Sequence, residues 1–151
     1  MLPFWLAKPE RGWCPFKRPG VDAFLEHLAK FYEIVVYSDQ MNMCVDPVCE
    51  RLDANHYIRC RLSRGTFKAK HGSSQDFIVS AHAFDSSLQP ENCVPIKPYK
   101  LETDDTALLD LIPFLEYIAR NSPADIRQVL QSYERKYIAK EFLERSKEYQ
   151  R

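Results

Sequence analysis

A polar strand end is the first place in this sequence where residue types and spacing could support chemistry. Residues 33–38 predict a strand, and its continuous apolar run suits a strand covered on both faces. Ser38 and Asp39 end this run. Open α/β sheets place their chemistry at the carboxyl ends of their strands. Ser38 and Asp39 are therefore site candidates, although a serine here is also a common turn former.

Cysteines and histidines are the second group that could carry chemistry, as metal ligands. No CxxC or HxxxH pair occurs, and the odd number of scattered cysteines argues against a disulfide framework. We expect buried thiols, no metal ion and no cofactor. The residues in question are Cys14, Cys44, Cys49, Cys60, Cys93, His56, His71 and His82.

An acidic stretch is the third candidate, as a binding surface. Residues 101–119 hold five acidic residues and no Lys or Arg, in a chain whose 21 basic and 21 acidic residues otherwise balance. Such a surface could complement a basic partner. The alternative is that these are helix-cap residues and a solvated helix face. The proposed partner-binding residues are Glu102, Asp104, Asp105 and Glu116.

The elements that must position these residues follow from hydrophobic periodicity. Helical and strand-like segments alternate, which predicts an α/β fold with a mostly parallel sheet. Within this pattern, Pro113 should kink its helix, and Ser122 and Pro123 should begin the next one. Helices are predicted from residue 21, around 43–52, over 106–120, from 122 and in 134–151, and strands at 33–38, 57–62, 77–80 and 93–96.

Composition sets outer limits on function. Hydrophobic residues make up 45% of the 151-residue chain and charged residues 28%, which is ordinary for a globular domain. A net charge of zero argues against nucleic-acid binding. No apolar run is long enough to cross a membrane, and the first residues resemble neither a secretory signal nor a transit peptide.

Three stretches together resemble a known family. They are 17–25 (KRPGVDAFL), 37–39 with 45–48 (YSD, VDPV), and 89–96 with 104–106 and 108–115 (QPENCVPI, DDT, LLDLIPFL). Over about residues 11–120 the chain resembles the small RNA-polymerase C-terminal-domain phosphatases of the haloacid dehalogenase superfamily. Within it, the sequence is most similar to the fifty-kilodalton subunits of the mitochondrial inner-membrane presequence translocase. Residues 119–127 and 133–150 resemble the plant form of that subunit.

The resemblance implies a test of catalytic residues. Phosphatases of this superfamily need a DxDx(T/V) motif, whose first Asp forms an acyl-phosphate and whose acids work with Mg²⁺. No DxD occurs in this chain. Ser38 occupies the second motif's hydroxyl position, and Ser80-Ala81 replaces the metal-binding Asp-Asn of the fourth. Neither Lys68 nor Lys70 matches the phosphate-neutralising lysine of the third motif.

The same comparison implies a non-catalytic receptor or scaffold subunit. Asp39, Asp46 and Asp85 could be substitute acids, but a strand end, a position before a helical proline and a loop explain them better. The alternative is a magnesium-dependent aspartyl-type protein phosphatase. A third possibility is a truncated product without independent function.

The family's partners and location follow from the resemblance alone. Members act in the import of precursor proteins into the matrix. They meet presequence-bearing precursors and the translocase channel subunit, at the inner membrane and facing the intermembrane space. Presequences are basic amphipathic helices, so the acidic stretch would suit them.

The resemblance also predicts a gap in the fold. The superfamily's first strand lies in the middle of its sheet, and the chain shows no match to it. Strand 33–38 should therefore lack a neighbour along one edge, unless residues 1–10 fill the place, and the protein should be marginally stable or aggregated. We expect an irregular segment at 1–20, an incomplete phosphatase-like domain at 21–120 and a helical extension at 121–151.

Overall fold

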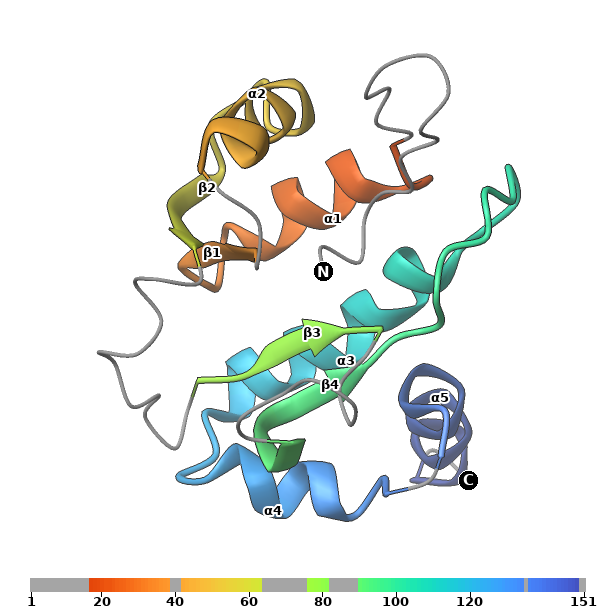
Figure 1. Ribbon diagram of the computed structural model, residues 1–151. Coiled ribbons are helices and arrows are strands. Elements are labelled where there is room, and N and C mark those ends of the chain that lie inside the picture. Colours follow the sequence, from red (N-terminus) through yellow and green to blue (C-terminus); the bar gives the residue numbers. More distant parts are fainter. Residues whose placement is uncertain (1–16, 39–41, 64–75, 82–89, 135, 150–151) are drawn as a thin grey trace.

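The computed structural model describes residues 17–38, 42–63, 76–81, 90–134 and 136–149 (Figure 1). Helices and short strands alternate along most of the chain, as the periodicity predicted. The helices are α1 Val21–Leu28, α2 Asn42–Leu52, α3 Ala107–Asn121, α4 Ile126–Gln131 and α5 Ile138–Tyr149, with a 3₁₀ turn at Pro90–Asn92; the strands are β1 Ile34–Ser38, β2 Ile58–Ser63, β3 Ile78–Ser80 and β4 Cys93–Pro95.

Both strand pairs are parallel, which confirms the predicted α/β class. β1 pairs with β2 from Ile34 opposite Ile58 to Ser38 opposite Ser63, with an irregularity after Ile34. α2 forms the crossover between them, as the spacing of a parallel pair requires. β3 pairs with β4, with Val79 opposite Val94.

The described strands form two separate two-stranded sheets. Figure 1 shows β1 and β2 beside α2, and β3 and β4 beside α3 and α4. Within the described residues no ladder joins β1 to β3. The expected gap beside β1, with its alternative of a shorter sheet, stays a prediction. Residues 1–10, the other candidate for the place, lie outside the described residues.

The expectation that β1 is covered on both faces is wrong. α2 covers one face, where Val36, Val45 and Cys49 form a small core of their own. Val35 points the opposite way and is 44% exposed. An apolar run predicts a strand but does not say how many layers pack on it. Val35's register partner, Cys60, is also exposed, so the prediction of buried thiols fails there while it holds for Cys49 and Cys93.

The main core lies between α1, α3 and the β3–β4 sheet. α3 contributes one continuous apolar face and runs without a break through Pro113. Gly20 caps the start of α1 with φ 79°. A Cβ there would stand 2.7 Å from Leu109 Cγ, so both the left-handed backbone and the close approach to α3 favour glycine.

The C-terminal helices belong to the same core. Tyr133 and Phe142 stack edge-on against Phe114 of α3, with ring centroids 5.3 and 5.7 Å away. The buried members contributed by this part of the chain are Ile126, Leu130, Tyr133, Ile138 and Ala139. The described residues of α4 and α5 therefore pack into the main core.

The predicted helix start at Ser122 is wrong. Ser122 instead ends α3 in the left-handed region, with φ 39°. α4 begins four residues later, where Asp125 accepts a hydrogen bond from the backbone N–H of Arg127. Ser122 and Asp125 both have side chains that can cap a helix. Because the buried face of α3 extends to the residues before Ser122, Asp125 is the one that caps α4.

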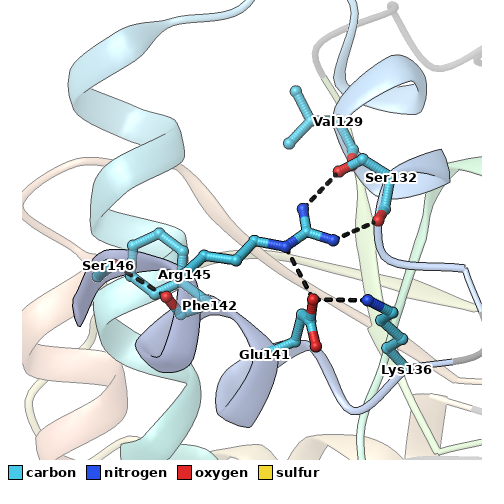
Figure 2. Close-up of polar contacts among 7 residues, drawn as sticks. All are labelled: Val129, Ser132, Lys136, Glu141, Phe142, Arg145 and Ser146. Carbon is cyan, nitrogen blue, oxygen red and sulfur yellow. Dashed lines mark hydrogen bonds and ion pairs between the residues drawn. The ribbon is translucent and has the colours of Figure 1, made fainter. Parts of the chain in front are cut away.

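Arg145 attaches α5 to the end of α4 (Figure 2). Its guanidinium donates to the backbone oxygen of Ser132 at 2.9 Å and to the carboxylate of Glu141 at 2.9 Å. The same group lies 4.3 Å above the ring of Tyr133. Lys136 reaches Glu141 from the opposite side at 2.6 Å. These contacts hold α5 against the residues that follow α4.

Candidate functional site: an acidic cavity at the start of α3

Among the described residues, the strand ends that the sequence singled out carry few chemical groups. Ser38 is buried at the end of β1, and Ser80 and Ala81 end β3 half-buried. Within the described residues no three His, Cys, Asp or Glu side chains come together as metal ligands. Asp46, one of the substitute acids, forms an ion pair with Arg61 at 3.2 Å. Asp39, Asp85, Lys68 and Lys70 lie outside the described residues.

The acidic stretch, in contrast, does form a concave site. A cavity of about 400 Å³ opens at the start of α3. Three of the four proposed partner-binding residues line it, together with one further carboxylate, a lysine and a tyrosine. Neither Ser38 nor Ser80 takes part. The lining residues are Lys97, Glu102, Asp104, Asp105, Thr106, Ala107, Asp110 and Tyr137.

Asp105 is the structural anchor of this cavity. Its two carboxylate oxygens accept hydrogen bonds from Nε and Nη2 of Arg18, each at 2.9 Å. Both side chains have no exposed surface. Asp105 also accepts the N–H of Ala107 at 3.1 Å, and Arg18 lies over Tyr99. Because its charge is already paired and enclosed, Asp105 cannot meet a partner directly.

The pKa of Asp105 follows from these contacts. Burial would raise this pKa, but the hydrogen bonds from Arg18 and Ala107 and the positive charge of Arg18 outweigh burial and lower it below its ordinary value of 3.8. A carboxyl group whose pKa is lower in the folded state than in the unfolded state stabilises the fold at pH values above its ordinary pKa. That stabilisation is lost as the pH falls through the folded-state pKa.

We therefore expect an acid-dependent loss of stability that belongs to Asp105. Urea unfolding measured between about pH 5 and pH 2 should show the free energy of unfolding falling with pH. The slope should be smaller in Asp105→Asn, which has no proton to bind. Equal slopes in the two proteins would contradict the assignment to Asp105.

The remaining carboxylates of the cavity differ in how far they are neutralised. Glu102 accepts from Lys97 at 2.8 Å, and this contact raises the pKa of Lys97. Asp110 accepts only the hydroxyl of Thr106, at 2.8 Å, among the described hydrogen bonds. Asp104 is exposed and forms no ion pair with any described residue. Asp104 and Asp110 therefore give the cavity its free negative charge.

Glu116 is separate from this site. It lies farther along α3 and bonds to His27 of α1 at 2.9 Å and to Arg120 at 2.6 Å. The bonds from Arg120 and then His27 lower the pKa of Glu116. Glu116 thus joins α1 to α3, and the acidic stretch divides into one cavity and one helix–helix contact.

Sequence reasoning missed three residues of the site. Arg18 lies 87 positions before Asp105, and nothing in either segment indicates the pairing. Tyr137 directly precedes α5, in the segment predicted as a C-terminal helical extension. Lys97 lies just before the acidic stretch, and its spacing of five from Glu102 was the one available signal.

Comparisons with known proteins place the chain in a family. Residues 4–127 match the NLI interacting factor-like phosphatase family, and the chain belongs to it. The chain is 67% identical to the mitochondrial import inner membrane translocase subunit TIM50 of Arabidopsis thaliana, over 95% of this chain and 42% of that protein. It is 35% identical to the subunits of the same name from Emericella nidulans and Debaryomyces hansenii, over 91% and 90% of this chain. The chain spans about two-fifths of the Arabidopsis relative and about three-tenths of the two fungal ones.

Proposed function

We propose that this chain is a non-catalytic receptor or scaffold module of the mitochondrial inner-membrane protein translocase. The observation that carries the proposal is the 67% identity to the Arabidopsis translocase subunit, which extends over 95% of the chain. At that identity the two chains share the family fold. The partners are the translocase channel subunit and presequence-bearing precursors, met at the inner membrane from the intermembrane space.

The arrangement of the strand ends supports the non-catalytic part of this proposal. Aspartyl phosphoryl transfer needs a nucleophilic carboxylate with a second acid and Mg²⁺. The chain contains no DxD sequence, and Ser80-Ala81 ends β3 without a carboxylate. The rival function is a magnesium-dependent phosphatase. The observation that favours it is the family's description, which names a phosphatase.

We expect no phosphatase activity above background with an aryl phosphate and excess Mg²⁺, because covalent transfer lacks its first step. The matched control is Ser38→Ala, which removes the hydroxyl at the second motif's position. Turnover present in the wild-type chain and lost in Ser38→Ala would support the rival function.

The receptor part has its own test. The immobilised chain should retain a precursor that carries a presequence and release it when a free presequence peptide is added. The control is the same precursor without its presequence, which should pass through. Equal retention of both precursors would count against a receptor role, and retention of neither would overturn it.

Within the described residues no helix is long and apolar enough to cross a membrane.

A further inference from the structure

α3 presents an apolar stripe on its outer side. The residues it buries all lie on one face, against α1, the β3–β4 sheet and α5. On the opposite face Leu109, Pro113 and Tyr117 are exposed and spaced four residues apart. At 1.5 Å per residue this stripe is about 12 Å long.

A further apolar side chain extends the stripe to the cavity. Tyr137 lines the cavity together with Asp110. Leu109, Tyr117 and Tyr137 are three of the seven large hydrophobic side chains that are exposed in the described residues. We call this surface the α3 surface, made up of Asp104, Leu109, Asp110, Pro113, Tyr117 and Tyr137.

The charge on the α3 surface is concentrated at one end. Asp104 and Asp110, near the start of α3, pair with no described cation, whereas Glu116, beside Tyr117, forms an ion pair with Arg120 and a hydrogen bond with His27. An apolar stripe with unpaired carboxylates beside one end complements a helix with one apolar side and basic residues next to it.

We propose that the α3 surface binds one basic amphipathic helix. Its apolar side lies along Leu109 and Tyr117, and its basic side chains lie beside Asp104 and Asp110. This inference rests on the proposed receptor function and gives it a location.

Lys97 has a defined part in this arrangement. Its ammonium group occupies the edge of the cavity, bonded to Glu102 at 2.8 Å, and is the one cation among the lining residues. A partner's Lys or Arg entering the cavity is repelled by this charge and competes with it for Glu102. Lys97 therefore acts as an internal competitor that keeps binding weak and reversible.

The test is fluorescence anisotropy with a labelled presequence peptide and the whole chain. Asp104→Asn with Asp110→Asn should weaken binding about tenfold, and so should Leu109→Gln with Tyr117→Gln. Lys97→Ala should strengthen binding about threefold. The control for charge is Glu26→Gln with Glu50→Gln, two exposed acids on α1 and α2, which should leave binding unchanged.

Three further measurements make the outcomes separable. Each variant is melted first, and one that has lost its cooperative transition is replaced by Asp104→Asn or Tyr117→Gln alone. Raising the ionic strength from about 0.05 to 0.3 M should weaken wild-type binding and affect the Asp104→Asn, Asp110→Asn protein less. A peptide with the same composition but scrambled apolar positions should bind at least tenfold more weakly.

The possible outcomes separate a failure of the α3 surface proposal from a failure of the proposed receptor function. Wild-type binding that both double variants retain would overturn the α3 surface while leaving the receptor function standing. A wild-type chain that binds neither the peptide nor a presequence-bearing precursor would overturn both. Weakening by the acidic and apolar pairs alike, with the Glu26 and Glu50 control unaffected, is the result that supports the proposal.

Discussion

Replacing Asp105 by alanine is expected to lower the free energy of unfolding by about 3–5 kcal/mol. The change leaves the guanidinium of Arg18 buried, with none of the carboxylate oxygens that it contacts at 2.9 Å. One nitrogen of that group, Nη1, already has no hydrogen-bond partner. Without the Asp105 carboxylate, Nε and Nη2 of Arg18 lose these hydrogen bonds as well. The cost is then that of a buried positive charge with no compensating partner.

Urea unfolding followed by circular dichroism measures this effect, and two variants serve as controls. Asp104→Ala removes the neighbouring but exposed carboxylate and should change stability by no more than about 0.5 kcal/mol. Arg18→Met combined with Asp105→Leu should be more stable than Asp105→Ala alone, because no buried charge is left unpaired. Equal destabilisation by Asp104→Ala and Asp105→Ala would show that the buried pair is not the anchor.

Phe114→Ala should cost about 3–5 kcal/mol, because it removes a fully buried ring from the junction of three helices. Phe114 lies on α3 and contacts Tyr133 and Phe142 from the C-terminal part of the chain. The loss should therefore loosen α5 as well as lower global stability.

The control is Leu143→Ala, on the exposed side of α5, which should change stability by less than about 1 kcal/mol. Thermal melts of both variants, with limited proteolysis near residue 135, measure the two effects. A cooperative melt for Phe114→Ala within a few degrees of wild type would contradict the packing of Tyr133 and Phe142 into the core.

Much of the fold could be predicted because it depends on local patterns. The apolar faces of α1 and α3, the crossover through α2 and the parallel pairing all follow from periodicity and element order. Helix ends were less predictable, since Ser122 and Asp125 offer similar caps and the packing of α3 selects Asp125. Likewise, the apolar run of β1 predicts a strand but not the exposure of Val35.

The candidate site could be predicted only as a stretch of charge. The sequence placed Glu102, Asp104, Asp105 and Glu116 together, but a run of acids does not show which of them is already neutralised. Long-range partners decide that: Arg18 encloses Asp105, and His27 holds Glu116. Asp110 was counted in the stretch but not proposed as a binding residue, and the structure places it in the cavity.

The buried Arg18–Asp105 pair also accounts for the shape of the α3 surface. It fixes the loop before α1 to the start of α3, and Gly20 in that loop lies directly under Leu109. Leu109 is therefore held at the surface instead of sinking into the core. The same pair orients the segment that carries Asp104. The Arg18–Asp105 ion pair therefore positions both Leu109 and Asp104, which a basic amphipathic helix would contact.

The central claim is that this family member binds a basic helix on α3 and not at the strand ends where phosphatase chemistry would lie. The most direct test is to map backbone amide shifts of the 17.7-kDa chain by NMR during titration with a presequence peptide. We expect the largest changes at residues 101–110, 117 and 137. Largest changes around Ser38 and Ser80, with residues 101–117 unaffected, would contradict it.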